Sequence, residues 1–397
     1  MRALIFLIVV SLTSLLGPSA YAQTRTPQRA TGVHAVRLYN AIGRPALVEL
    51  IFDAAHSDAR LVILDADGQS LADITPIRPG RLDLAERWPD LWSLNTPAYA
   101  QLVLIDTPVG APLVIHPMLS RQVPVTNREV HPLYGNWYTR IVGWRDENVP
   151  EPEEPETFNA PEGTTFGAQD NAAPGPTEVP VEDVTGEPTN RTGVRLYEAR
   201  DVIMRTSDGT LRIAMAYDAA PNTACNFVNL VDGGFYDGVI FHRIVPFDRT
   251  GRPFVIQGGD PSKTGDGAPG YWLPIEPSTL EHTFGVISMA RADDPDSAGS
   301  QFFFCLSREG TARLDGQYCA FGYAVEGRET ILTIANTPLA DAATGAPQNP
   351  PVILEATTVA APPREPGVNR LTHRVTQRVI EPNIAPAKTP DTDRVGR

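Results

Sequence analysis

One arginine with aromatic and amide neighbours is the chemically distinctive feature of this chain. It lies in four runs, which read Phe-His-Arg at 241–243, Phe-Val-Ile-Gln-Gly-Gly-Asp at 254–260, Ser-Gln-Phe-Phe-Phe at 300–304 and Leu-Asp-Gly-Gln-Tyr at 314–318. Ser300 does not lie in a nucleophile elbow, and His242 and His282 have no Cys or second His at ligand spacing. The pattern therefore disfavours hydrolysis and metal chemistry. The remaining candidate for a chemical role is Arg243, a permanent cation with several directed N–H donors.

That set of side chains suits rotation about an X-Pro peptide bond, a reaction in which no covalent bond is made or broken. Twisting a peptide bond breaks its resonance and costs about 20 kcal/mol, so X-Pro isomers interconvert in tens to hundreds of seconds. A catalyst needs an apolar pocket for the proline ring, anchors for the flanking chain and a donor for the prolyl nitrogen. The donor accelerates rotation only if it binds the twisted state more strongly than the planar states.

Taken together and in this order, the four runs resemble the cyclophilin family of peptidyl-prolyl isomerases over residues 195–360. The resemblance implies a mainly β domain, an eight-stranded antiparallel barrel with two helices and with its site on the outer face. It implies peptidyl-prolyl cis-trans isomerase activity on proline-containing polypeptides. No cofactor and no metal are implied, since the reaction is neither redox nor group transfer.

The resemblance also assigns site residues, beginning with the catalytic group and the proline pocket. Arg243 matches the family's catalytic arginine. Phe254, Phe303 and Leu314 match residues that form the proline pocket, with Val255 at its edge.

Further positions match residues that hold the substrate chain. Gln257 and Gln301 match the polar groups that orient the arginine and hold the peptide. Ala290 and Arg291 match the strand edge along which substrate backbone lies. Tyr318 takes the place usually held by a histidine at the pocket rim.

His242 is grouped with the substrate-binding residues because it precedes Arg243. A structural hydrogen-bonding role is the alternative interpretation, and no titrating role is assigned to it.

Three features depart from the family pattern. The loop 247–252 lengthens the connection between Arg243 and Phe254, and Arg313 stands where many members carry tryptophan. Arg291 replaces a common asparagine. Its positive charge predicts a preference for acidic residues flanking the proline.

The net charge of the whole chain limits the classes of binding partner that we expect. The sequence has 397 residues, with 47 acidic and 33 basic side chains and a net charge of -14. Nucleic acid and anionic membranes attract clustered cations, so we expect neither as the main partner. The charge favours solubility instead.

The first 22 residues have the pattern of a signal peptide. Arg2 is followed by an apolar run, 4–10, and Ala20-Tyr21-Ala22 matches a small-x-small cleavage site. The run is short for a bilayer span of about 20 residues. We expect an exported chain, periplasmic or secreted, with no membrane span after cleavage.

Residues 32–145 predict a smaller β-rich domain, a sandwich or barrel of unknown function. Short apolar runs at 33–39, 46–52, 60–64, 101–106 and 113–116 are separated by turn formers, and 82–88 predicts a short helix. The tryptophans are interpreted as core, with a binding patch for an unknown partner as the alternative; they are Trp88, Trp92, Trp137 and Trp144.

Two segments have the composition of disordered chain. Residues 146–192 form a Pro/Glu-rich linker, and 361–397 a tail without apolar period. Between them, 193–360 predicts the isomerase domain, with helices at 221–231 and 328–335 and strands at 199–206, 210–217, 239–245, 254–258, 285–290, 300–307, 319–325 and 352–359.

Two questions stay open in the sequence. Cys225, Cys305 and Cys319 are more consistent with small core residues than with a disulfide. The groove could also belong to a non-catalytic chaperone or scaffold module that binds proline peptides. The intact Arg243 favours catalysis over that alternative.

Overall fold

The computed structural model describes the backbone of residues 29–120, 122–130, 137–146 and 190–368. The predicted signal peptide and most of the predicted linker lie outside these ranges. Among the described residues, no helix combines the length and apolarity needed to cross a bilayer.

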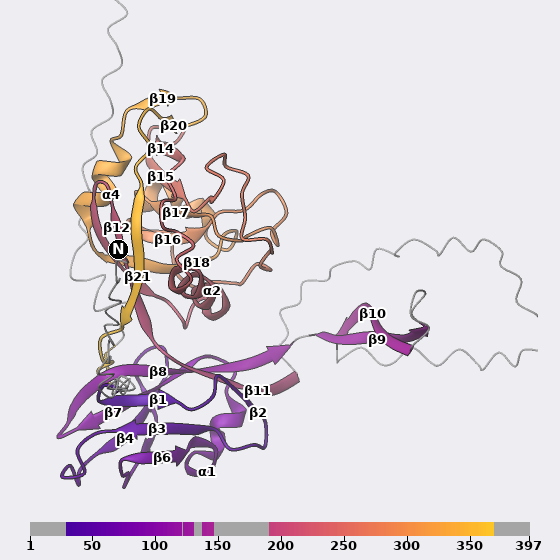
Figure 1. The fold of residues 1–397 in the computed structure, drawn as a ribbon, viewed down its shortest axis with the longest axis vertical. Coiled ribbons are helices and arrows are strands. Elements are labelled where there is room, and N and C mark those ends of the chain that lie inside the picture. The colour runs from indigo at the N-terminus through magenta and orange to yellow at the C-terminus, as the bar shows by residue number, and fades with distance from the viewer. Residues whose placement is uncertain (1–28, 121, 131–136, 147–189, 369–397) are drawn as a thin grey trace, which may run out of the picture. The chain divides into compact units, whose positions relative to one another are not determined.

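The described part of the N-terminal region contains two larger antiparallel sheets and one two-stranded pair (Figure 1). The smaller sheet has the order β1 (Gly32–Ala35), β3 (Leu47–Ile51), β6 (Gly80–Asp83). The larger has the order β2 (Tyr39–Ala41), β11 (Asn190–Glu198), β8 (Thr107–Ser120), β7 (Ala98–Leu104), β4 (Arg60–Leu64), β5 (Ser70–Ile74). The short helices α1 (Leu84–Arg87) and η1 (Pro89–Ser93) follow β6, and β9 (Gln122–Val130) pairs with β10 (Trp137–Asp146).

Alternating apolar residues give these sheets a common core. Val48 and Leu50 of β3 are buried, while their neighbours on the strand are partly exposed. Successive strand residues face opposite sides, so one side of β3 packs inward. Trp88 is also buried in this core and Trp92 packs against it, which confirms the core interpretation for these two residues. The side chains of Trp137 and Trp144 lie outside the described ones.

Strand β11 lies at the C-terminal end of the predicted linker in the sequence, but it belongs to the larger N-terminal sheet. It pairs with β8 on one side and β2 on the other. Val194 and Leu196 are each 1% exposed and lie in the apolar core. The predicted second domain begins at residue 193, within this strand, so the first domain's sheet contains a strand from beyond the linker.

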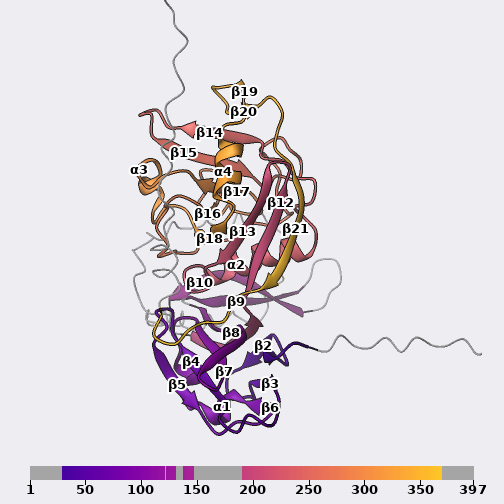
Figure 2. The same cartoon turned by 90° about the vertical axis from the view of Figure 1, so that its left-hand side faces the viewer.

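The C-terminal region is an eight-stranded antiparallel half-barrel, which confirms the predicted fold class (Figures 1 and 2). Its strand order is β14 (Arg243–Phe247), β15 (Pro253–Gly258), β17 (Phe302–Cys305), β16 (Val286–Met289), β18 (Ala320–Glu326), β13 (Gly209–Met215), β12 (Arg200–Thr206), β21 (Ile353–Ala360).

Two helices close the barrel core. Helix α2 (Pro221–Asp232) begins with proline at its first position, where the missing N–H costs nothing. It buries Phe227, and α4 (Arg328–Ala335) buries Ile331 and Ile334. These residues pack with Phe302 and Phe304 in one apolar cluster.

Some elements differ from the predicted ones. The strand expected at 239–245 begins only at Arg243, because Ile240 makes isolated bridges to Asp260 and Val352. In the C-terminal region, four short elements were not predicted: α3 (Arg308–Thr311), η2 (Ala312–Leu314), and the two strands of the hairpin β19 (Leu339–Asp341) and β20 (Ala346–Pro347). Each has too few residues to show an apolar period.

The predicted tail and the cysteines show specific contacts. In the described segment 361–368, Arg364 is 5% exposed. Its guanidinium lies over the Tyr99 ring and its main-chain N–H donates to Gln101 Oε1 at 2.8 Å. Cys305 and Cys319 are buried, Cys225 is partly buried, and all three are free thiols.

His116 on β8 generates a prediction about pH. It is 6% exposed and its Nδ1 accepts a hydrogen bond from Arg195. Burial, and then the Arg195 charge, lower the pKa of His116 from 6.5 to about 3. Between about pH 3 and pH 6.5, His116 therefore binds a proton in the unfolded chain but not in the folded chain. We expect the free energy of unfolding to fall as pH drops from 6.5, by up to about 1.4 kcal/mol per pH unit from this group.

The variant His116→Gln should make that slope shallower in urea unfolding measured between about pH 5 and pH 7.5. The matched control is His56→Gln, at a more exposed histidine. An unchanged slope in His116→Gln would contradict this account.

Candidate active site

Strand pairing gathers the chemically distinctive residues in one row. Arg243 lies opposite Gln257, which lies opposite Phe303, which lies opposite Ser288. Directly opposed residues on neighbouring strands face the same side, with strands about 4.8 Å apart. The next row, Ile244-Ile256-Phe304, faces the barrel core instead. Arg243 and Phe303 thus stand about two strand spacings apart on the outer face.

A relay of amide groups holds Arg243. Its Nη1 donates to Gln257 Oε1 at 3.1 Å, and Gln257 Nε2 donates to Gln301 Oε1 at 3.0 Å. Gln301 Nε2 donates to the carbonyls of Gly265 and Gly267, at 2.8 and 2.9 Å. Because each amide both accepts and donates, the relay orients the guanidinium while leaving its charge uncancelled.

An open cavity of about 470 Å³ lies over this row. Its apolar part rests on a second cluster that includes Val255, Phe303 and Leu314, all nearly buried, with Phe254 packed against it. The cavity is lined by His242, Arg243, Phe254, Val255, Gln257, Thr264, Gly265, Ala290, Arg291, Phe303, Leu314, Tyr318, Thr344 and Ala346. An apolar floor beside an exposed cation can hold a small ring next to a hydrogen-bond donor.

All the sequence-predicted site residues line this cavity except Gln301, which lies behind it in the relay. Sequence reasoning missed Thr264, Gly265, Thr344 and Ala346. The last two come from the loop and strand of the unpredicted β19–β20 hairpin, where the main-chain N–H of Ile244 donates to Gly345 O at 2.8 Å. Nothing in their residue types indicates a site.

Asp260 shapes the loop that supplies Thr264 and Gly265. Its carboxylate accepts from the N–H and hydroxyl of Ser262, both at 2.7 Å, and from the N–H groups of Thr264 and Gly265. Burial alone would raise the pKa of Asp260, but these bonds outweigh it and lower the pKa to about 2. The carboxylate therefore stays charged and acts as a structural acceptor.

His242 sits at the cavity wall with its Nδ1 buried and without a hydrogen-bond partner among the described residues. Burial lowers its pKa, although Asp260 opposes the shift. The ring is therefore neutral near pH 7. Within the described part of the chain, no group of three His, Cys, Asp or Glu side chains is placed to hold a metal ion.

Two arginines, called here the rim arginines, lie over aromatic side chains that line the cavity; of the two, only Arg291 lines it itself. The Arg291 guanidinium lies 4.6 Å from the centroid of the Tyr318 ring, and Tyr318 meets Phe303 edge to face at 5.8 Å. The Arg313 guanidinium lies 4.4 Å from the centroid of Phe254. Both are at cation–π distance.

The lengthened loop, 247–252, is bonded to Arg313 through Asp248. Asp248 Oδ2 accepts from Arg313 Nη1 at 3.2 Å, and Asp248 Oδ1 accepts from the N–H groups of Thr250 and Arg252. Burial acts to raise the pKa of Asp248, but hydrogen bonds led by the Thr250 hydroxyl lower it to about 2. One carboxylate thus shapes the loop and holds Arg313 against Phe254.

The C-terminal region is similar to known proteins. Residues 201–358 match the family model for cyclophilin type peptidyl-prolyl cis-trans isomerase/CLD. A peptidyl-prolyl cis-trans isomerase of Synechococcus elongatus is 44% identical over 120 residues, which are 30% of this chain and 77% of that protein. Peptidyl-prolyl cis-trans isomerase B of Bacillus subtilis is 41% identical over 121 residues, covering 30% and 78%. The chain belongs to the cyclophilin-type peptidyl-prolyl isomerase family.

A solved structure also matches this cyclophilin. It is the cyclophilin type peptidyl-prolyl cis-trans isomerase of Cryptosporidium parvum, 30% identical, with a TM-score of 0.37. The match covers 41% of this chain and 99% of that chain. Cyclophilin domains in general bind proline-containing peptides.

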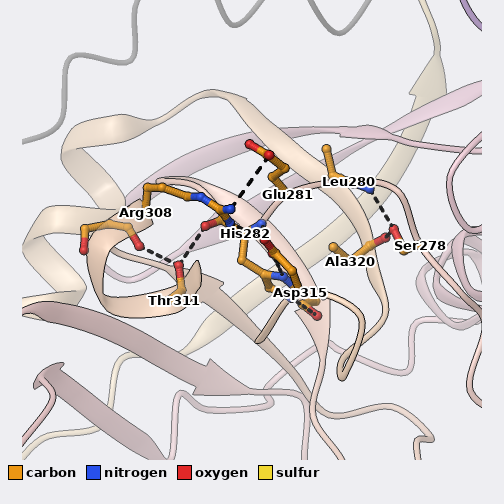
Figure 3. A network of polar contacts seen from close by, with 10 residues as sticks. Ser278, Leu280, Glu281, His282, Arg308, Thr311, Asp315 and Ala320 are labelled. Atoms are coloured by element: carbon orange, nitrogen blue, oxygen red, sulfur yellow. Dashed lines mark hydrogen bonds and ion pairs between the residues drawn. The ribbon is translucent and has the colours of Figure 1, made fainter. Parts of the chain in front are cut away.

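A polar network centred on the buried His282 lies next to pocket residues of this cyclophilin; Figure 3 shows His282, Asp315 and Arg308 from this network. His282 is 1% exposed, and its ring lies nearly parallel to Phe303, with centroids 6.1 Å apart. Its Nδ1 donates to Asp315 Oδ1 at 2.9 Å, so its Nε2 can accept from the Ser288 hydroxyl at 3.0 Å. Arg308 pairs with the other oxygen of Asp315.

This network has two links to the pocket. Ser288 lies opposite Phe303 in the strand register, and Asp315 directly follows Leu314. Burial lowers the pKa of His282, and Asp315 opposes the shift. A neutral ring with Nδ1 protonated therefore fits both of its bonds. The sequence offered no signal for this role, since His282 and Asp315 are 33 positions apart.

We expect His282→Ala to weaken both stability and catalysis. The change leaves the buried Ser288 hydroxyl without its His282 partner, which costs about 1–3 kcal/mol. Asp315 keeps its pairing with Arg308 and its bond from the main-chain N–H of residue 282. Loss of the ring beside Phe303 should also loosen the pocket and raise KM more than it lowers kcat. Urea unfolding and peptide isomerisation kinetics measure the two effects, with His56→Ala as control. Unchanged stability and KM would refute the supporting role.

Proposed function

We propose that this cyclophilin catalyses X-Pro rotation through a hydrogen bond from Arg243 to the prolyl nitrogen. As the bond twists, resonance is lost and the nitrogen lone pair localises, so the nitrogen becomes a better acceptor. A donor that strengthens only then lowers the barrier. No bond to carbon forms or breaks, so neither a nucleophile nor a cofactor is required.

The observation that carries this proposal is the row Arg243-Gln257-Phe303. It sets a charged donor beside an apolar floor within one rigid sheet. Phe303 and Leu314 offer a surface for the proline ring, and the amide relay keeps Arg243 from turning away. A preorganised donor of this kind needs little reorganisation during the reaction.

Replacing Arg243 with alanine tests the mechanism. We expect kcat/KM for proline isomerisation to fall by roughly 100- to 1000-fold, as for other single donors to a developing charge. Arg243→Lys should recover only part of the rate, because it keeps the charge but loses the planar fork of donors. Arg205→Ala is the control, since Arg205 pairs with Glu355 and does not line the cavity. Full activity in Arg243→Ala would rule the mechanism out.

The same assay separates catalysis from simple binding. The wild-type protein should both bind proline peptides and accelerate their isomerisation. Measurable peptide affinity without any rate acceleration would favour a non-catalytic chaperone or scaffold.

We further propose that the enzyme assists the folding of exported proteins in the periplasm or outside the cell. The support is the N-terminal pattern: Arg2, the apolar run 4–10 and the Ala20-Tyr21-Ala22 site. Slow X-Pro isomerisation limits folding wherever chains fold after export.

Export predicts a mature chain that begins at Gln23. N-terminal sequencing of the protein from fractionated cells checks this, together with a variant that lacks residues 2–22 and should stay in the cytoplasm. Recovery of an intact Met1 chain in the cytoplasm would contradict the proposal.

A further inference from the structure

The cavity carries positive charge although the chain as a whole is acidic. Arg243 and Arg291 line the cavity, and no acidic side chain is among the described residues that do so. The net charge of the whole chain is -14. A carboxylate on a bound peptide would thus meet cations at contact distance, where the interaction is least screened.

Arg291 is fixed in place by acceptors that do not neutralise it. Its Nε and Nη2 donate to Gln317 O at 3.2 and 3.1 Å. Its Nη1 donates to Ala292 O at 2.8 Å and to Asp293 O at 3.1 Å. All of these acceptors are main-chain carbonyls without formal charge. Since a guanidinium has five N–H groups, these four bonds leave one N–H, on Nη2, for a ligand.

Arg313 shows the opposite arrangement. It pairs with the Asp248 carboxylate at 3.2 Å, so its charge is largely balanced within the protein. Of the two rim arginines, Arg291 is therefore the one that offers net charge to a peptide. Tyr318 lies between Arg291 and Phe303, which places the guanidinium within a few residues' reach of a proline ring on Phe303.

We propose that Arg291 is a specificity-determining residue that selects peptides with an acidic side chain within the two positions before the proline, an inference that rests on the proposed function. Ala290, next to Arg291, lines the cavity and its N–H is bound to Gln301 O at 2.9 Å. In the proposed complex, the substrate chain that precedes the proline lies along this edge, next to Arg291.

Three aspartates in the following loop limit the size of the effect. Asp293, Asp294 and Asp296 are exposed, and the last two accept main-chain hydrogen bonds from Asp296 and Ile275, respectively. They offset part of the Arg291 charge. Exposed charge pairs are weak in any case, so we expect about a two- to fivefold preference.

The experiment compares acetylated, amidated peptides Ala-X-Pro-Phe and X-Ala-Pro-Phe, in which X is Glu, Gln or Lys and is the only variable charge. Isomerisation is followed by NMR exchange at low and high salt. In the wild-type protein, kcat/KM should be about two- to fivefold higher for Glu than for Gln in at least one series, lowest for Lys, and nearly equal at high salt.

Two variants should move the preference in opposite directions. Arg291→Gln keeps an amide donor for Gln317 O but removes the charge, and should abolish the preference, while Arg291→Lys should restore part of it. Asp293→Asn removes a competing charge and keeps the carbonyl that accepts from Arg291, so it should strengthen the preference. Arg205→Gln is the distant control.

Equal kcat/KM for Glu and Gln peptides in the wild type, or a preference that persists in Arg291→Gln, would overturn this inference alone. Failure of every peptide to turn over would overturn the proposed function, and this inference with it.

Discussion

The site depends on the register in which β14, β15 and β17 pair. Side chains alternate between the two faces of a strand, so a shift of one residue would exchange the rows. Phe303 would enter the barrel core, and Phe302 or Phe304 would take its place on the outer face. The register is held because the inner row, Ile244-Ile256-Phe304, is buried among the helices that fill the barrel. Packing on one face thereby sets the chemistry on the other.

The pocket is also coupled to the polar network behind it. In the proposed mechanism, Phe303 and Leu314 must stay rigid for a proline ring to meet Arg243 at one distance, and both belong to a small apolar cluster. The bonds of His282 to Ser288 and Asp315 fix the positions that neighbour both residues. A polar network whose members are all bonded rigidifies its surroundings. Support of this kind is invisible in residue types and depends on contacts between distant segments.

Features that depend on local sequence pattern could be predicted, whereas features that depend on contacts between distant segments could not. Strands such as Arg60–Leu64 and the helix Arg328–Ala335 follow from apolar period alone, and the family motifs locate Arg243 and its neighbours. Three consecutive phenylalanines, 302–304, carry no alternation, so the family resemblance and not the local pattern singles out Phe303; strand pairing explains why it faces the pocket. The contacts of Arg313 with Asp248 and Phe254 join segments more than 50 positions apart, and no local rule indicates them.

The strand β11 shows the same limit at the scale of a domain. Its composition alone would suit either neighbour, yet it lies between β2 and β8 and supplies Val194 and Leu196 to the N-terminal core. Residues 121–189, which include the pair β9–β10, therefore connect two neighbouring strands of one sheet, β8 and β11. Closing a loop costs entropy that rises only with the logarithm of its length, so a long insertion there weakens the sheet little. Strand β11 runs directly into β12 of the isomerase barrel, with one residue between them.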